Sequence, residues 1–311
     1  MQLKENSKKS KIQIAGGVSS ALKHDSGSKH VTGQAIYTDD IPTTENTLNV
    51  YIAMSTRAHA KITSLDVSEV RKQPGVACVL TADEIPGVND VSPVAGDDPM
   101  FAEDVVQYYG QSLFAVAAET IEQARSSAKL AEVEYEDLPA VLTIDHAMEE
   151  KFYLISPYTM KRGDAASAID QAPHSITGRI YIGGQEHFYL EGQAALALPG
   201  EDEDVIVYSS TQHPSEIQHK VAEVLGVPSH SITVEVRRMG GAFGGKESQG
   251  NLLAATAALV AHKTSRPAKV VYDRDDDMMI TGKRHDIRID YRVGYDQDGR
   301  IHGVEFDQAV G

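Results

Sequence analysis

A glycine-rich segment between two predicted elements is the part of this sequence best suited to chemistry. Residues 240–245 read GGAFGG, with four glycines in six positions, and Lys246 and Glu247 follow. The alternation of residues 231–236 predicts a strand before the segment, and the Leu- and Ala-rich residues 252–261 predict a helix after it. Glycines allow close approach to a ligand, and a helix start offers unpaired N–H groups and a partial positive charge. The pattern therefore indicates an anion-binding site for a phosphate or pyrophosphate.

Two other interpretations of this segment remain open. Residues 240–246 fit the G-x-x-x-x-G-K pattern of nucleoside triphosphatases, but that pattern requires Ser or Thr next to hold magnesium, and Glu247 stands there. Ser248 comes one residue late, which on a helix turns a side chain by about 100°. The segment could also be a turn that only packs the helix against the strand, because glycine patterns are weak signals by themselves.

Side chains that bind metals are sparse. Cys78 is the only cysteine, which excludes a disulfide framework, a cysteine-ligated zinc site and an iron–sulfur cluster held by this segment alone. His187 and Glu191 are four positions apart, but they lie in an apolar block, which favours packing over metal binding. The acidic run at residues 275–277 is typical of an exposed turn after a strand.

Composition and charge exclude several classes of partner. The chain has 311 residues, with 29 Lys and Arg and 45 Asp and Glu, so its formal net charge is −16. Binding to nucleic acid or to a membrane surface needs clustered cations, so neither is expected. The N-terminal residues lack the apolar core of a secretory signal, and the apolar run 254–261 is far shorter than a membrane span. We expect a cytoplasmic protein without disulfides.

Short apolar runs separated by turn residues predict an α+β fold of about two domains. Strands are predicted at 50–54, 76–80, 112–118 and 134–136, and a helix at 120–132. The predicted divisions are a flexible N-terminal arm (1–25), a first domain (26–145), a linker (146–174) and a second unit (175–311). Residues 301–311 alternate like a strand and stop without a turn or polar tail, so we expect the chain to be a fragment.

Two long blocks resemble signatures of one enzyme family. Residues 238–247, RMGGAFGGKE, resemble the RMGGGFGGKE block of the molybdenum subunit of xanthine dehydrogenases, and residues 183–191, GGQEHFYLE, resemble a second block of that family. Weaker matches occur at 35–42, 55–62, 135–140 and 273–278. Residues 192–193 and 248–249 resemble the bacterial form, in which the molybdenum part is a separate subunit.

This resemblance implies a hammerhead-type α/β domain followed by the first part of a molybdopterin-binding α+β domain. It implies a purine-catabolism enzyme that hydroxylates hypoxanthine or xanthine with oxygen derived from water. Electrons would leave through 2Fe–2S clusters and FAD to NAD, all on a partner subunit, so a hetero-oligomer is expected. Molybdopterin, with the cytosine dinucleotide as one candidate form, would hold the metal, so no direct protein ligand is expected.

The resemblance also assigns roles to particular residues. Gln185 matches the glutamine that hydrogen-bonds an oxygen of the molybdenum centre, where an amide donates without adding charge. Phe243 matches the residue whose main-chain amide lies near molybdenum, and Gly244 leaves room for that approach. Glu247 matches the substrate-binding glutamate, which favours purines over aldehydes. An acid near a helix start is also favoured by the helix dipole, by about 0.3–1 kcal/mol.

Departures from the family pattern leave alternatives open. Ala242 replaces a third glycine, which would cost about 1–2 kcal/mol if that position needs a positive φ. The family's substrate-binding arginine and its general-base glutamate are expected beyond Gly311, so no catalytic residue is assigned here and the 311 residues alone are expected to be inactive. The alternatives are an aldehyde or other N-heterocycle hydroxylase of the same family, and an inactive truncated fragment.

Overall fold

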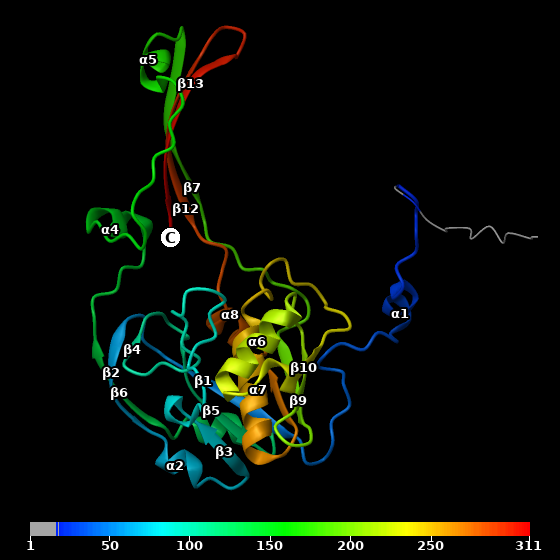
Figure 1. Cartoon of the computed structure of the whole chain (residues 1–311). Helices are drawn as coiled ribbons and strands as arrows, with labels where there is room; N and C mark the ends of the chain where they lie inside the picture. The colour runs from blue at the N-terminus through cyan, green and yellow to red at the C-terminus, as the bar shows by residue number, and fades with distance from the viewer. Residues whose placement is uncertain (1–16, 18) are drawn as a thin grey trace, which may run out of the picture. The chain divides into compact units, whose positions relative to one another are not determined.

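Apolar residues at alternate positions build a mixed sheet with a core on each face. In the computed structural model the largest sheet has seven strands, in the order β10-β9-β8-β11-β1-β5-β3 (Figure 1). Every residue of β5 (Ser112–Ala118) is buried. Ala115 and Ala117 belong to one core, and Phe114 belongs to the other. Such a strand needs apolar side chains on both faces, because successive side chains point to opposite sides of the sheet.

The structure describes Gly17 and residues 19–311. Most of the predicted arm, namely residues 1–16 and 18, lies outside this described part. The chain forms two compact units, 1–36 and 37–311, and α1 (Gly27–Thr32) belongs to the first.

Strands from both predicted domains share the large sheet. Its other members are β1 (Leu48–Met54), β3 (Val76–Leu80), β8 (Ala194–Pro199), β9 (Val205–Ser209), β10 (Ile232–Glu235) and β11 (Ala268–Val271). β1 pairs in parallel with β11, with Leu48 opposite Ala268. The strands of the predicted second unit, 175–311, therefore continue the sheet that the predicted first domain, 26–145, begins.

Helices cover the two faces of this sheet. α7 (Gly250–Thr264) packs on β8, β9 and β11, and α6 (Pro214–Leu225) packs on α7 and β10, whereas α3 (Ile121–Ala128) packs on β1 and β5. α3 starts at a capping box, in which the side chains of Thr120 and Gln123 bond each other's main-chain N–H groups. The remaining helical segments are α2 (Ser68–Arg71), α4 (Ile144–Glu149), α5 (Ala165–Asp170), α8 (Arg274–Ile280), η1 (Ala82–Glu84) and η2 (Ser229–Ser231).

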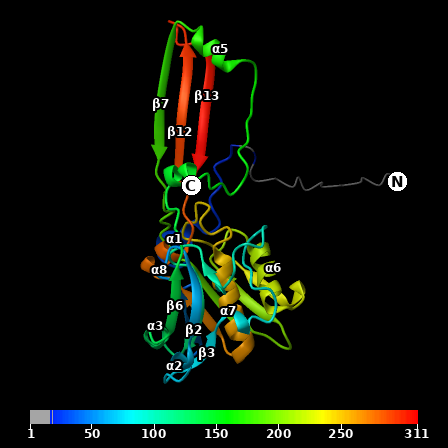
Figure 2. The same ribbon diagram turned by 90° about the vertical axis from the view of Figure 1, so that its left-hand side faces the viewer.

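Two smaller sheets complete the second compact unit. One has the order β4-β2-β6 and contains β4 (Val105–Val106), β2 (Ala60–Asp66) and β6 (Glu132–Asp137). In the other, β7 (His174–Ile182), β12 (Ile287–Tyr295) and β13 (Ile301–Val310) lie side by side (Figure 2). α5 approaches this sheet closely at Gly294, where an added Cβ would lie 2.7 Å from Ile169 Cα. Only glycine fits that approach.

Several predicted elements are confirmed. The strands at 76–80 and 112–118 have the predicted bounds, and α3 lies inside the helix predicted at 120–132. The segment predicted as a linker, 146–174, is not all loop, because it contains α5. The Asp164 side chain caps that helix by accepting from Ser167 N–H. Among the described residues, no helix has the length and apolar character needed to cross a membrane.

Candidate functional site

The glycine-rich segment lies where two parallel strands end. β9 and β10 pair in parallel, with Val205 opposite Ile232, so their carboxyl ends lie at one edge of the sheet. Residues 240–246, here called the glycine loop, follow β10, and residues 210–213 follow β9. The carboxyl ends of parallel strands are where α/β sheets place ligands. α7 begins at Gly250, two residues before the predicted helix at 252–261, so its first N–H groups come after the loop rather than within it.

The main chain of the loop takes left-handed conformations at three positions. Gly241 has φ of +98° and Gly244 of +92°, values that side chains rarely adopt. Phe243 also has a positive φ, +56°, which costs about 1–2 kcal/mol for a residue with a side chain. Its ring is 76% exposed and does not fill a core. Ala242 has no positive φ, so the replacement of glycine there causes no strain of this kind.

Three consecutive N–H groups of the loop have no hydrogen-bond acceptor within the described part of the chain. The flanking N–H groups are engaged, because Gly240 donates to Glu191 Oε2 at 2.8 Å and Gly244 donates to Gln212 Oε1 at 3.0 Å. The N–H groups of residues 241–243 donate to no residue in the part of the chain that the structure describes. Adjacent free N–H donors in a glycine-rich turn form a concave site for anionic or polar oxygen atoms.

A glutamine that the sequence analysis did not single out contacts the loop. Gln212 Oε1 accepts hydrogen bonds from the N–H groups of Gly244, at 3.0 Å, and Lys246, at 3.4 Å. Its Nε2 donates to none of the described residues. A usable signal was its place just after the apolar strand β9, since β9 neighbours β10, the strand that leads to the loop.

Gln185, which the resemblance matches to the glutamine beside the molybdenum centre, lies on the block at residues 183–191. Its main chain forms an isolated bridge with Arg284, with both N–H to O distances 3.0 Å. Its side chain is exposed, and no hydrogen bond joins it to the glycine loop within the described part of the chain. The two signature blocks are nevertheless adjacent, because an added Cβ at Gly245 would lie 2.6 Å from the His187 ring.

Lys246 points into the protein rather than toward a ligand. Its side chain is fully buried, and its Nζ lies 3.0 Å from Glu191 Oε2 and 4.6 Å from the centre of the Tyr189 ring. Burial lowers the pKa of Lys246, and the Glu191 carboxylate opposes that shift. The lysine of a triphosphatase loop must reach the phosphates. The triphosphatase interpretation therefore does not fit this loop.

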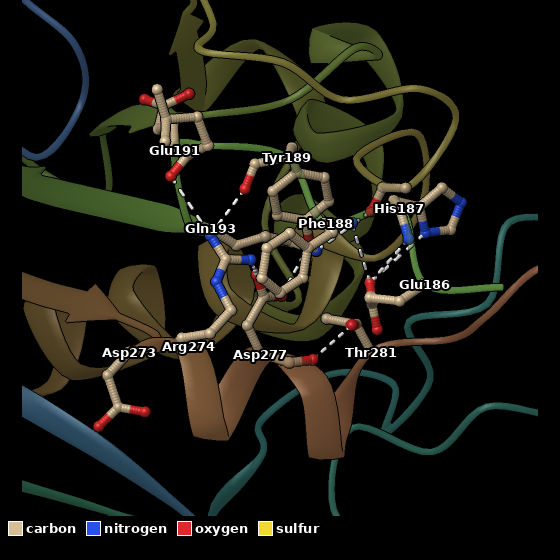
Figure 3. Close-up of polar contacts among 12 residues, drawn as sticks. Glu186, His187, Phe188, Tyr189, Glu191, Gln193, Asp273, Arg274, Asp277 and Thr281 are labelled. Carbon is tan, nitrogen blue, oxygen red and sulfur yellow. Dashed lines mark hydrogen bonds and ion pairs between the residues drawn. The ribbon is translucent and has the colours of Figure 1, made fainter.

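Tyr189 links the second block to the loop and to α8. Its hydroxyl donates to Asp277 Oδ1 at 2.7 Å and accepts from Gln193 Nε2 at 2.9 Å (Figure 3). The same Nε2 donates to Gly245 O at 3.1 Å. Burial and the hydrogen bond to Asp277 raise the pKa of Tyr189 above its usual value, so the phenol stays protonated. These contacts fix the distance between the two blocks.

The acidic run 275–277 is part of α8, not an exposed turn. Asp276 is 4% exposed and Asp277 is 1% exposed. Asp277 pairs with Arg274 at 3.2 Å, while Asp276 pairs with Arg125 of α3. Burial raises the pKa of Asp277, although the hydrogen bond from Tyr189 and the Arg274 charge oppose the shift. The prediction of an exposed turn was wrong for Asp276 and Asp277, which are buried against Arg125, Arg274 and Tyr189, whereas Asp275 is exposed.

An open cavity of about 570 Å³ lies beside the loop, a volume within the range of small-molecule sites. Gly244 and Gly245 of the loop line it together with Gly184 and His187 of the other block. Gln185, Phe243 and Glu247 do not line the cavity themselves. An added Cβ at Gly244 would meet no atom within 4 Å, so the main chain is open to a ligand there.

Glu247 turns outward where Lys246 turns inward. Its carboxylate is exposed and bonds no residue of the described part of the chain. It lies two residues before the N-cap of α7, so the dipole of that helix also favours an acid at this position. The described residues include no group of three or more His, Cys, Asp or Glu side chains that could hold a metal ion.

The fold places an open cavity against the glycine loop. Two family models match the chain: the a/b hammerhead domain of aldehyde oxidase and xanthine dehydrogenase over residues 32–139, and a molybdopterin cofactor-binding domain over residues 146–310. The chain belongs to the xanthine dehydrogenase and aldehyde oxidase family, and it carries part of the family's molybdopterin-binding region.

Known proteins of this family resemble the chain along most of its length. It is 42% identical over 285 residues to the xanthine dehydrogenase/oxidase of Rattus norvegicus, an alignment that covers 91% of this chain and 21% of that protein. It is 41% identical over 290 residues to aldehyde oxidase 2 of Cavia porcellus, with 93% and 21% covered. The chain therefore spans about a fifth of the length of these relatives.

Solved structures share the fold. The aldehyde oxidoreductase of Desulfovibrio gigas matches with a TM-score of 0.82 and 26% identity, over 92% of this chain and 34% of that one. The quinoline 2-oxidoreductase of Pseudomonas putida 86 matches with a TM-score of 0.82 and 24% identity, over 92% of this chain and 38% of that one. The predicted α+β architecture, a hammerhead domain and a molybdopterin-binding domain, is confirmed.

Proposed function

We propose that this chain holds the molybdopterin cofactor of a xanthine dehydrogenase that hydroxylates hypoxanthine and xanthine. The observation that carries the proposal is the row of free N–H groups at residues 241–243 beside a cavity of about 570 Å³. This cradle supplies donors for the oxygen atoms of the cofactor without adding side-chain charge. Bound there, the cofactor would supply the metal centre for oxygen transfer to the substrate.

The residues of this chain bind and orient. The N–H of Phe243 is one of the free donors, and Gly244 keeps the main chain accessible. We assign Gln212 as the side-chain amide that donates to the cofactor. Its Oε1 is held by the loop, and its Nε2 donates to none of the described residues. Gln185 remains the alternative donor, on the block that reaches the same cavity through Gly184.

Glu247 supports the purine as substrate. Its exposed carboxylate follows the loop directly and can accept hydrogen bonds from purine N–H groups. The identity to aldehyde oxidase 2 of Cavia porcellus, 41%, favours aldehydes or other heterocycles as a second candidate substrate class. We assign the iron–sulfur clusters, FAD and NAD to a partner subunit. For the clusters the support is that Cys78 is the only cysteine in this sequence and a cluster needs several thiolates.

Metal and pterin content test the cofactor assignment. The full natural protein that contains this chain, purified with its partners from cells that make molybdopterin, should carry molybdenum and pterin in equal amounts. Gln212→Ala should lower the metal content more than Gln185→Ala does, because only Gln212 contacts the loop in the described structure. A purified wild-type protein that lacks both metal and pterin would contradict the proposal.

Substrate preference tests the role of Glu247. Glu247→Gln should lower kcat/KM for xanthine by about tenfold or more, the size expected when a hydrogen bond to a charged group is lost. Turnover of an aromatic aldehyde should change little. Glu235→Gln, at the exposed end of β10, is the matched control. Unchanged xanthine turnover in Glu247→Gln would favour the aldehyde or heterocycle alternative.

A further inference from the structure

One carboxylate group fastens both ends of the glycine loop. Glu191 Oε2 accepts the N–H of Gly240, the first residue of the loop, at 2.8 Å. The same oxygen lies 3.0 Å from the Nζ of Lys246, the last residue of the loop. The free N–H groups of residues 241–243 lie between these two attachment points in the sequence.

The pair is buried, so its two charges depend on each other. Lys246 is 0% exposed and Glu191 is 11% exposed. An isolated buried charge is strongly unfavourable, and it persists only with a close partner and further hydrogen bonds. The Tyr189 ring, 4.6 Å from Lys246 Nζ, adds a cation–π contact. Lys246 is therefore held to one position, and the loop that ends at it is held as well.

The geometry leaves little room at the first attachment point. An added Cβ at Gly240 would lie 2.6 Å from Glu191 Cβ, so the two main chains approach as closely as glycine allows. Gln193 fastens the loop from the same segment, because its Nε2 donates to Gly245 O at 3.1 Å. The second block thus acts on the loop through side chains that do not line the cavity.

We propose that Glu191 and Lys246 are positioning residues, which hold the glycine loop in its ligand-binding form before the cofactor arrives. This inference rests on the proposed function for the identity of the ligand. A loop already ordered loses little conformational freedom on binding, so its N–H groups meet the cofactor at low entropic cost. The strained main chain at Phe243 requires such support, since left-handed conformations persist only where surrounding contacts impose them.

Two double variants separate positioning from simple packing. Glu191→Gln with Lys246→Met removes both charges but keeps an amide oxygen that can accept the Gly240 N–H. Glu191→Leu with Lys246→Met removes the same charges and also that acceptor. Both avoid a lone buried charge, so both should fold. The matched control is Asp90→Asn with Lys220→Met, a largely buried ion pair of 3.1 Å without contacts to the loop among the described residues.

Amide hydrogen exchange of the cofactor-free protein gives the first measurement. We expect the hydrogen-bonded loop amides, those of Gly240, Gly244 and Lys246, to exchange about tenfold faster in Glu191→Leu/Lys246→Met than in wild type. That size is in line with the loss of a hydrogen bond to a charged group. Glu191→Gln/Lys246→Met keeps an acceptor for Gly240 but loses the attachment at Lys246, so its exchange should lie between that variant and wild type. The control pair should exchange within about twofold of wild type. Exchange at the wild-type rate in Glu191→Leu/Lys246→Met would overturn the proposal, because neither Glu191 nor Lys246 would then hold the loop.

Cofactor retention gives the second measurement, on the full natural protein with its partners. Glu191→Leu/Lys246→Met should lose molybdenum on dialysis faster than Glu191→Gln/Lys246→Met, although the two melt at similar temperatures. Retention equal to that of wild type in both double variants would also overturn the proposal. If Glu191→Leu/Lys246→Met does not fold, Gly240→Ala replaces it, because its added methyl displaces Glu191. A wild-type protein without molybdenum would refute the proposed function alone, since exchange still tests the positioning role.

Discussion

At the scale of single residues, the glycine loop combines strain with unused hydrogen-bonding capacity. Phe243 has φ of +56° and an exposed ring, so neither backbone preference nor side-chain burial explains its presence. Strained, solvent-facing residues of this kind cluster at binding sites. The free N–H groups of residues 241–243 give that strain a chemical use, because the unusual main chain leaves consecutive donors without partners in the described structure.

Substitution of one loop glycine tests the conformational requirement. Gly244→Ala should lower the free energy of unfolding by about 1–2 kcal/mol, because φ of +92° is unfavourable for a residue with a side chain, although space for the methyl group is available. Gly183→Ala is the control, since Gly183 has open space and no positive φ, and it should be neutral or stabilising by about 0.4–1 kcal/mol. Urea unfolding measures both, and equal effects would show that the loop conformation is not required.

The local sequence predicted part of this site. Glycine spacing located the loop, and the resemblance selected Phe243, Gly244 and Glu247, whose roles remain predictions. Gln212 was missed because its contact with Gly244 depends on the pairing of β9 and β10, which no local pattern encodes. The inward direction of Lys246 was missed for a similar reason, since its partner Glu191 is distant in sequence.

At the scale of elements, local signals predicted the positions of strands and helices better than the tertiary contacts that those elements make. Short apolar runs gave β3 and β5 their predicted bounds, and helical spacing located α3, which begins after the cap at Thr120. α8 was missed, although Asp273 is an N-cap whose side chain accepts from Asp276 N–H. Acidic residues after such a cap indicate a helix start, and only tertiary contacts decide which of them are buried.

The three acids of α8 should differ sharply in their effect on stability. Asp277→Ala should lower the free energy of unfolding by about 3 kcal/mol, because it leaves Arg274 and the Tyr189 hydroxyl without their buried partner. Asp275→Ala, on the exposed side of the same helix, should change it by less than about 0.5 kcal/mol. Chemical unfolding measures both, and similar losses would indicate that helix propensity rather than the buried network decides.

At the scale of the whole molecule, the two predicted domains are joined by a shared sheet. β1 and β11 are far apart in sequence and pair in parallel, a connection that composition and periodicity do not reveal. Glu119, just after β5, and Arg266, just before β11, form a two-pronged ion pair with both N···O distances 2.8 Å. The pair joins residues from the two family regions, 32–139 and 146–310.

The Glu119–Arg266 pair predicts a specific pH dependence of stability. The hydrogen bond from Arg266 lowers the pKa of Glu119 below its ordinary value of 4.5. A lowered folded-state pKa means that the stabilisation is complete above the unfolded-state value and is lost as pH falls through the folded-state value. Glu119→Gln should therefore be less stable than wild type at pH 7 by about 0.5 kcal/mol, a small value because the pair is largely exposed. The difference should shrink below pH of about 4.5.

Urea unfolding at several pH values measures this difference in stability, with Glu45→Gln, an exposed glutamate, as the control. A difference that persists unchanged at low pH would show that the carboxylate charge does not join the two regions.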